Sequence, residues 1–358
     1  MTLLLSPEYS ASQSLRSVGR RWGTAIRSSR SALPLRIGII NIMPRAEVYE
    51  VNLLRPLERA PQTVEPIWIR LNDHRYGSSD AEHLRAHYVS FEDAVREPLD
   101  GLILTGAPIE QLEYEEVTYW RELVSILQFA RQNIAGTLGL CWGGMALAKL
   151  LGIEKRAFHQ KLFGVYSNRN LSPGRGYLGE SDDTFFCAHS RHSGIRDDDL
   201  EQAADRGTVQ LLSHGALTGY SVFASTDGRF LMHLGHPEYD AERLVTEWRR
   251  DSALGRADVR PPYNFDPLAP ANLWRAHGTT LFARWLTNLR SSEVLRDGAL
   301  AARHVSSGAS SLLRGTPPSA PQDLAEPRPR PSMDAYATPS EVARKATVHS
   351  DAMAIDLK

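Results

Sequence analysis

Four short apolar segments, separated by stretches with helical periodicity, constrain the fold of this chain more than any other feature. They are LRIGIINIM (35–43), VEPIWIRL (64–71), DGLILTGA (100–107) and TLGLCW (137–142). Each is nearly continuous in apolar residues, as expected for strands of a parallel sheet that is covered on both faces. Strands that alternate with helices are joined by right-handed crossovers. We therefore predict an α/β fold with a doubly wound, mostly parallel sheet.

Two helices are predicted around the fourth segment. In EEVTYWRELVSILQFARQN (115–133), Val117, Trp120, Val124 and Leu127 recur at helical spacing and predict one apolar stripe. GGMALAKLLG (143–152) predicts a second helix, closed by Gly152. Three later runs, TVQLLSH (208–214), YSVFAST (220–226) and RFLMHLGH (229–236), predict further strands that complete the sheet.

The two ends of the chain differ from this middle part, which spans about 35–290. Residues 1–34 are rich in Ser and Arg, and we predict a surface arm that orders only in part rather than a targeting peptide. Residues 291–358 hold 7 of the 21 prolines and a single aromatic residue, Tyr336. Such a segment buries too little apolar surface to offset the entropy of ordering it, which predicts a disordered tail.

Composition excludes several classes of protein. The 41 basic and 42 acidic residues leave a net charge of -1, which gives no reason to expect nucleic acid as a partner. No apolar run approaches the roughly 20 residues that span a bilayer, so no membrane partner is predicted. Neither Cys141 nor Cys187 belongs to a CxxC pair, which excludes a disulfide framework and a cysteine-rich zinc site. We expect a cytoplasmic enzyme or binding protein.

Two smaller features have structural interpretations. His83 and His87 are four residues apart on a predicted helix, a spacing that can bind zinc, but no third ligand is evident and we predict no metal site. Cys187 lies in an apolar segment and is predicted to be a buried strand thiol.

Cys141 lies where chemistry is expected in such a sheet, at the carboxyl end of the fourth strand. Gly143 and Gly144 follow it, the composition of a nucleophile elbow, in which small residues flank a sharp strand-to-helix turn. A thiol there lies at a helix N-terminus, which favours the reactive thiolate. The alternative is that Cys141 is a small buried apolar residue.

HLGHPEYD (233–240) is a second such segment, read as a strand that ends in His236 and Glu238. Residues two apart on an extended stretch point to one side, so the carboxylate can orient the imidazole. The alternative is a strand-end histidine beside a surface glutamate. Backbone N–H groups near Gly106 and Ala107, with that of Trp142, could stabilise an oxyanion, although Gly-Ala-Pro alone is only a tight turn.

LCWGGMALAKLLG and GHPEYD, in this order, resemble the class I glutamine amidotransferase fold. They resemble still more closely the homoserine O-acyltransferases of methionine biosynthesis, which form homoserine O-acetyl or O-succinyl esters. The resemblance covers about 35–290 and includes LRIGIINIMP, DGLILTGAPIEQLEYEEVTYW, KLFGVY, AHSR and WRAHGTTLFARWL. The tail after about 290 lies outside it, so the expected organisation is an arm (1–34), an acyltransferase domain (35–290) and the tail (291–358).

The resemblance implies a role for each matching residue. Cys141 matches the nucleophile that becomes an acyl-thioester, His236 the general base and Glu238 the third catalytic residue. Three further residues match substrate-binding positions: Lys161 in QKLFGVY, Ser190 in AHSR and Arg250 in WRRD.

Glu110 matches the position that sets the acyl donor in this family, where glutamate goes with acetyl-CoA and glycine with succinyl-CoA. The resemblance thus implies a homoserine O-acetyltransferase that uses acetyl-CoA and L-homoserine by a ping-pong route, without a metal or organic cofactor. Related enzymes indicate a homodimer. Succinyl transfer is the near alternative.

Three residues depart from the family pattern: Met145 replaces a glutamine, Tyr49 a threonine and Ala188 a proline. They leave the acceptor open, so that serine or another amino alcohol is an alternative to homoserine. Glutamine amidotransferase or glutaminase chemistry is disfavoured, because the glutamine-site pattern is missing around Met145.

Overall fold

The computed structural model describes residues 3–5, 9 and 34–291, all within one unit that spans Met1–Arg314. Beyond Ser291, the predicted tail lies outside the described residues, as does most of the predicted N-terminal arm. The described part of that arm is not on the surface. Leu3, Leu5 and Tyr9 are buried, and Leu3 bridges Val64 in the sheet.

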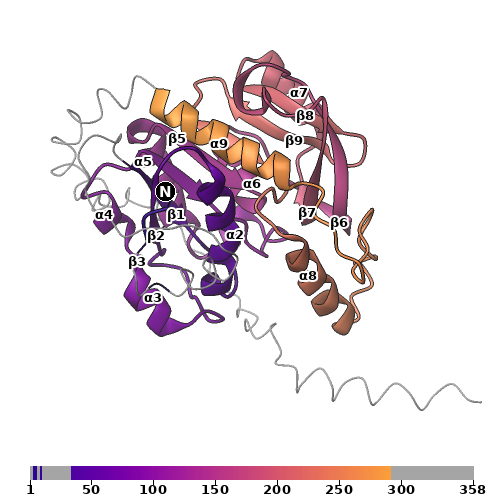
Figure 1. The fold of residues 1–358 in the computed structure, drawn as a ribbon, viewed down its shortest axis with the longest axis horizontal. Coiled ribbons are helices and arrows are strands. Elements are labelled where there is room, and N and C mark those ends of the chain that lie inside the picture. The colour runs from indigo at the N-terminus through magenta and orange to yellow at the C-terminus, as the bar shows by residue number, and fades with distance from the viewer. Residues whose placement is uncertain (1–2, 6–8, 10–33, 292–358) are drawn as a thin grey trace, which may run out of the picture. The chain divides into compact units, whose positions relative to one another are not determined.

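The ten strands form one sheet in the order β3-β2-β1-β4-β5-β10-β9-β8-β6-β7 (Figure 1). Their bounds are β1 Leu35–Ile40, β2 Val64–Ile69, β3 Tyr88–Val89, β4 Gly101–Leu104, β5 Gly136–Leu140, β6 Arg156–Asn170, β7 Thr184–Gly194, β8 Val209–Gly215, β9 Gly219–Ser225 and β10 Phe230–His233. The six strands from β3 to β10 in that order are parallel, and the other four pair antiparallel. The predicted α/β fold with a mostly parallel sheet is confirmed.

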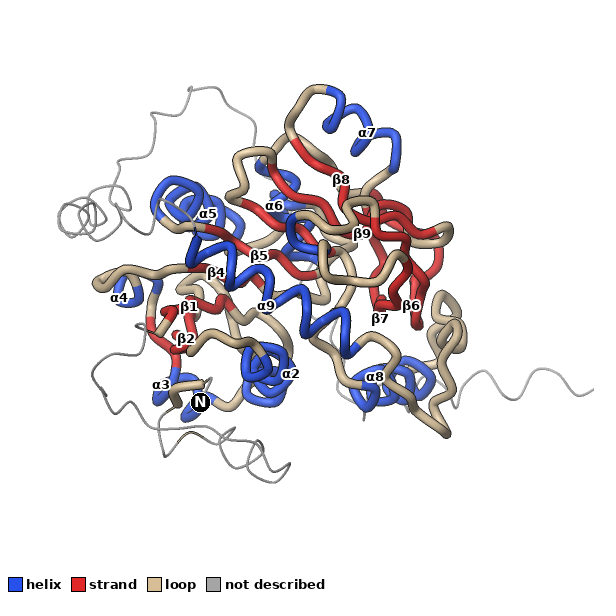
Figure 2. Tube along the Cα trace, turned by 45° about the horizontal axis from the view of Figure 1, so that its top comes forward, coloured by secondary structure: helices blue, strands red, loops and turns tan. Residues whose placement is uncertain are grey.

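Helices cover both faces of the parallel part. Their bounds are α2 Ala46–Arg59, α3 Ala81–His87, α4 Phe91–Ala94, α5 Trp120–Asn133, α6 Trp142–Leu150, α7 Asp197–Asp205, α8 Ala241–Ala253 and α9 Arg275–Ser291. One core cluster joins α2 and α9 to the sheet, and a second cluster joins α5 and α6 to it. Figures 1 and 2 both show α9 lying across the strands. As predicted, α6 ends just before Gly152, whose φ is 78°.

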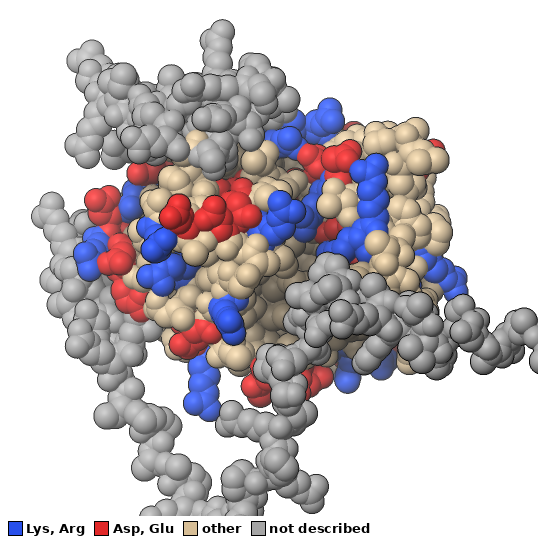
Figure 3. Space-filling model, turned by 90° about the horizontal axis from the view of Figure 1, so that it is seen from below, with Lys and Arg blue, Asp and Glu red and all other residues tan. Residues whose placement is uncertain are grey.

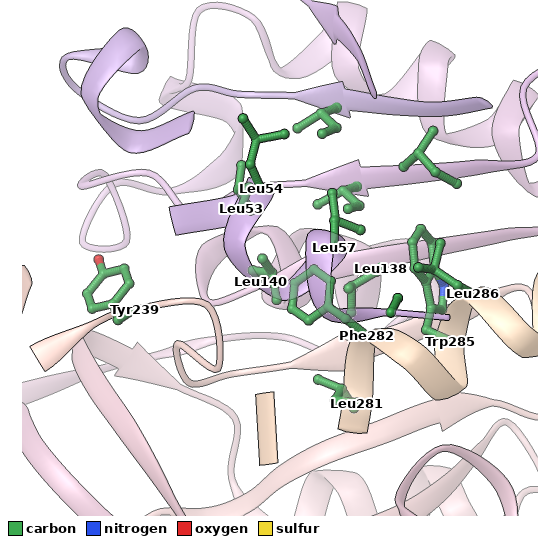
Figure 4. Packing of buried hydrophobic residues seen from close by; sticks show 14 of the residues in the cluster. Leu53, Leu54, Leu57, Leu138, Leu140, Tyr239, Leu281, Phe282, Trp285 and Leu286 are labelled. Carbon is green, nitrogen blue, oxygen red and sulfur yellow. The ribbon is translucent and has the colours of Figure 1, made fainter. Parts of the chain in front are cut away.

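Packing on the α2 and α9 face explains why the central parallel strands are largely apolar. Figure 4 shows leucines of α2, Phe282 and Trp285 of α9, and Leu138 and Leu140 of β5 within this core. All of these side chains are essentially inaccessible to solvent. Because alternate residues of each strand face the other cluster, every position of β4, β5 and β10 is buried and no polar alternation remains there.

The antiparallel part is where the sequence was least informative. β6 was not predicted, and β7 was predicted only around the strand thiol Cys187, because their many polar residues break any longer apolar run. Asn168, Asn170 and Arg191 are nonetheless buried, each with hydrogen-bond partners. β8 and β9 were predicted as strands that complete the sheet, and they do so as an antiparallel hairpin.

The apolar stripe predicted for the helix before β5 differs from the face that the helix buries. α5 begins only at Trp120, so Val117 precedes it, and Val124 is partly exposed. The face that packs on the sheet is a neighbouring one at the same helical spacing: Leu123, Ile126, Leu127 and Ala130.

The visible surface matches the balanced charge of the sequence. On the face drawn in Figure 3, acidic and basic side chains are interspersed among uncharged residues. None of the described helices combines the length and apolarity that a membrane crossing requires.

Candidate active site

Cys141 occupies a strained turn between β5 and α6. Its φ of 51° and ψ of -113° lie in a region that L-residues rarely adopt, at a cost of about 1–3 kcal/mol. The turn is held by a hydrogen bond from the Cys141 N–H to the carbonyl of His233, at 2.8 Å. The structure therefore has the sharp strand-to-helix turn that the sequence predicted.

Glycines make this turn sterically possible. A Cβ at Gly143 would lie 2.4 Å from the carbonyl oxygen of Leu104, and one at Gly139 would lie 2.5 Å from that of Gly143. Backbone atoms cannot yield at such distances, so α6 packs on β4 and β5 only because these side chains are absent.

Gly143→Ala is therefore expected to reduce the free energy of unfolding by about 2–3 kcal/mol, the usual cost of overpacking. Gly77→Ala is the matched control, because a Cβ at Gly77 meets nothing within 4 Å, and we expect a change within about 0.5 kcal/mol. Urea unfolding of both variants measures the difference. Equal midpoints for the two would contradict this account of the elbow.

His236 and Glu238 lie in a turn after β10, which ends at His233, so the strand geometry expected from the sequence was wrong. The turn nevertheless brings the two side chains together. His236 Nδ1 lies 2.7 Å from Glu238 Oε1, and both residues are buried. Tyr49 donates its hydroxyl to the same oxygen. The Tyr239 ring stacks on His236 with the centroids 3.9 Å apart.

The cysteine and the histidine meet beside Gly106, in the turn after β4. A Cβ at Gly106 would lie 3.3 Å from Cys141 Cβ and 3.5 Å from His236 Cε1. Because Glu238 occupies Nδ1 of His236, Nε2 is the nitrogen left for the thiol. Ala107 follows Gly106 and is buried, and Trp142 opens α6, where the first N–H groups of a helix lack intrahelical acceptors.

The electrostatics of this group favour a protonated imidazole. Burial alone would lower the pKa of His236, but Cys141 and Glu238 together raise it to about 10. The ring is therefore protonated at neutral pH. A positive charge beside Cys141 stabilises the thiolate, which is the nucleophilic form of cysteine.

We expect iodoacetamide to alkylate Cys141 more slowly in His236→Ala than in wild type at pH 7, because the variant lacks the positive charge beside the sulfur. The measurement is labelling at Cys141, followed by peptide mass spectrometry. Equal rates of labelling in the two proteins would contradict the charged pair.

Lys161, Ser190 and Arg250, predicted as substrate-binding residues, come together around two acidic residues of α8. Ser190 donates its hydroxyl to Glu247, and Lys161 Nζ lies 2.7 Å from Asp251 Oδ2. Arg250 Nε also donates to Asp251, at 2.7 Å. The structure thus joins β6, β7 and α8 in one polar group.

The sequence analysis missed Glu247 and Asp251, as well as Arg243, which donates to Glu247 at 3.2 Å. These three residues are spaced four apart, so they share one face of α8, and that pattern could have identified them. Burial would raise the pKa of Glu247, but Lys161 and nearby arginines lower it to about 2, so the carboxylate is ionised.

Glu110 lies in the turn region after β4 and is buried against β7. Its Oε1 accepts the backbone N–H of His192 at 3.1 Å and lies 3.3 Å from His192 Nδ1. Ser193 donates to the backbone carbonyl of Glu110 at 2.6 Å. Burial would raise the pKa of the Glu110 carboxyl, but the hydrogen bonds from His192 lower it below its ordinary value.

Cys187, His233 and His277 form a buried group whose ligand atoms lie within 4.8 Å of one another. The N–H of Gly235 donates to His233 Nδ1 at 3.0 Å, so the proton of the neutral His233 ring is on Nε2. That nitrogen lies 3.0 Å from His277 Nε2 and donates to it. This arrangement is a hydrogen-bonded histidine pair, because a nitrogen that carries a proton cannot bind a metal.

The structure also accounts for His83 and for Cys187. His83 Nε2 lies 2.9 Å from the buried carboxylate of Glu50. Cys187 is a fully buried thiol of β7, as predicted, and burial raises its pKa well above the ordinary value.

Comparison with known proteins shows the family. The profile described as "HTS: Homoserine O-succinyltransferase" matches residues 3–294. The chain belongs to this family. The family assignment made from the sequence is therefore confirmed.

Several curated relatives are named homoserine O-acetyltransferase. That of Brevibacillus brevis is 37% identical over 71% of this chain and 83% of its own length. The relative from Geobacillus kaustophilus is 39% identical over 72% of this chain and 86% of its own length. Among solved structures, the chain is similar to a glutamine amido transferase from Methylobacillus flagellatus, with a sequence identity of 15% and a TM-score of 0.45. The similarity covers 72% of this chain and 96% of that chain.

Proposed function

We propose that this family member is a cytoplasmic homoserine O-acetyltransferase of methionine biosynthesis, which transfers the acetyl group of acetyl-CoA through a thioester on Cys141. The observation that carries the proposal is the strained position of Cys141 beside the His236–Glu238 pair. The predicted homodimer stays a prediction.

In the first half-reaction, the Cys141 thiolate attacks the thioester carbonyl of acetyl-CoA. The new carbon–sulfur bond forms, the bond to the CoA sulfur breaks, and His236 returns its proton to the departing CoA thiolate. Gly106 lies beside Cys141, and Trp142 follows it at the start of α6, which supports the N–H groups of Gly106, Ala107 and Trp142 as the proposed donors to the oxyanion of the tetrahedral intermediate.

In the second half-reaction, neutral His236 accepts the proton of the acceptor hydroxyl, which attacks the acetyl-Cys141 carbonyl. Acylation removes the negative charge of Cys141, one of the two groups that raise the His236 pKa. The pKa of the ring therefore falls after acylation, so that a larger fraction of His236 is neutral and can accept the proton of the acceptor hydroxyl. The O-acetyl ester leaves and the thiolate–imidazolium pair is restored.

The polar group on α8 supplies complementary charges for an amino-acid acceptor. The ionised Glu247 can bind an α-ammonium group. Arg250 is half exposed, and its guanidinium can bind an α-carboxylate. This arrangement selects for a zwitterionic amino alcohol such as homoserine over an alcohol without these charges.

Acetyl-CoA is the proposed donor because Glu110 is ionised and buried. Its lowered pKa keeps a negative charge that would repel a succinyl carboxylate, whereas a methyl group carries no charge. Succinyl transfer is the second candidate, and the description of the family profile favours it.

The test is a matrix of acyl-CoAs and acceptors: acetyl-CoA and succinyl-CoA, each with homoserine, serine and glutamine. Free CoA is followed together with the mass of the product. We expect turnover with acetyl-CoA and homoserine and a product one acetyl group heavier than homoserine. Faster turnover with serine would overturn the acceptor, and ammonia release from glutamine would overturn the acyltransferase.

A further inference from the structure

Tyr49, one of the departures from the family pattern, is bound directly to the candidate catalytic group. It lies near the start of α2, is fully buried, and donates its hydroxyl to Glu238 Oε1, the oxygen that also binds His236 Nδ1. We propose that Tyr49 is a positioning residue for the acyl-transfer reaction, acting on His236 through Glu238. The proposal rests on the proposed function of this site.

The hydrogen bonds of Glu238 show why the Tyr49 hydroxyl is important for holding this carboxylate in place. Its Oε1 accepts from Tyr49 and His236, whereas Oε2 has no hydrogen-bond partner among the described residues. A carboxylate buried with a single donor is poorly stabilised and can rotate. Tyr49 therefore supplies half of the described hydrogen bonds that fix this carboxylate.

Tyr49 can act only as a donor toward Glu238. Burial, with the charge of Glu238, raises the pKa of the Tyr49 hydroxyl well above its ordinary value, so it keeps its proton throughout the working pH range. The ring is confined as well. It packs edge-on against Tyr239, and the Arg243 guanidinium lies 5.7 Å from its centroid.

The next residue, Glu50, anchors this part of α2. Its buried carboxylate accepts hydrogen bonds from the hydroxyls of Tyr9 and Tyr88, the latter at 2.7 Å, and His83 Nε2 lies 2.9 Å from it. These contacts come from two separate segments of the chain, one at Tyr9 and the other at residues 83–88. The backbone that carries Tyr49 is thus fixed independently of Glu238, which is what a positioning residue requires.

The proposal predicts a defect in rate rather than in binding. The Tyr49 hydroxyl reaches the reacting atoms only through Glu238 and His236, so removal of the hydroxyl leaves the acceptor site on α8 intact. For Tyr49→Phe we expect kcat to fall about ten- to a hundredfold, the usual effect of one hydrogen bond to a charged group, with the KM for homoserine nearly unchanged.

Tyr88→Phe is the matched control. It removes a hydroxyl that also donates to a buried glutamate on α2, but that glutamate is Glu50, outside the proposed catalytic group. We expect its kcat to stay within about twofold of wild type. A defect caused only by a loosened α2 would affect both variants alike.

The decisive measurement is a double-mutant cycle with Glu238→Gln. The rate constant for CoA release is measured in a single turnover without acceptor. The amplitude of the same phase gives the amount of folded enzyme independently of the rate. If Tyr49 acts through Glu238, Tyr49→Phe slows wild type about ten- to a hundredfold but has less than about a twofold effect in Glu238→Gln. Tyr49→Thr, whose hydroxyl is too short to reach Glu238, should be as slow as Tyr49→Phe and serves if the latter gives no amplitude.

Two results would overturn the role of Tyr49. One is an unchanged rate in Tyr49→Phe or Tyr49→Thr, and the other is an equal loss in the two backgrounds. Both are distinguishable from failure of the proposed function, which would appear as CoA release that survives in Cys141→Ala.

Discussion

Cys141→Ala is expected to lower acetyl transfer by about 10⁴-fold or more, because the thioester cannot form without the sulfur. The elbow places this residue beside the His236 imidazole, which Glu238 orients. The measurement is CoA release from acetyl-CoA in the presence of homoserine, with thermal unfolding as a check that the variant folds.

Cys187→Ala is the control, because it removes the other thiol of the chain. That thiol is buried in β7 and lies 3.9 Å from His233, so its loss should leave turnover within about threefold of wild type. Unchanged turnover in Cys141→Ala, or loss of turnover in Cys187→Ala alone, would contradict the assignment of the nucleophile.

The second large effect concerns the donor. Glu110→Gly is expected to shift the ratio of kcat/KM for succinyl-CoA over acetyl-CoA by about a hundredfold toward succinyl-CoA, equivalent to about 2.7 kcal/mol. The substitution removes both the volume and the buried negative charge of Glu110, whose ionisation His192 favours. Both donors are measured on both proteins with homoserine as acceptor.

Glu110→Gln separates these two causes, since it removes the charge and keeps the volume. If repulsion dominates, Glu110→Gln should recover a large part of the shift. The same charge argument predicts weaker discrimination at low pH in wild type, where the Glu110 carboxylate becomes protonated, and not in Glu110→Gly. A wild type that already prefers succinyl-CoA would contradict the donor assignment and leave the acyltransferase intact.

The sequence was sufficient for the parts of the fold that are buried on both faces. The runs around β1, β4 and β5 are apolar because helices cover them on both sides, and this made the sheet, the elbow at Cys141 and the turn at Gly106 predictable. β6 and β7 carry buried polar side chains whose partners are distant in the sequence, such as Thr218 for Arg191. No local pattern reports contacts of that kind.

In the candidate site, too, some residues could be predicted from the sequence and others could not. His236 and Glu238 were predicted as a pair although the expected strand is a turn, because this turn also brings the two side chains together. Tyr49 and Glu238 are 189 positions apart, and their hydrogen bond follows only from the packing of α2 against the turn after β10. From the sequence, Tyr49 was merely a departure from the family pattern.

The most direct test of the central claim is the mass of the intact protein after incubation with acetyl-CoA and no acceptor. We expect a single acetyl group, located at Cys141 by peptide mapping, and its complete loss as O-acetylhomoserine when homoserine is added. An unmodified Cys141 under conditions of full turnover, or an acetyl group on another residue that homoserine removes, would contradict the cysteine thioester.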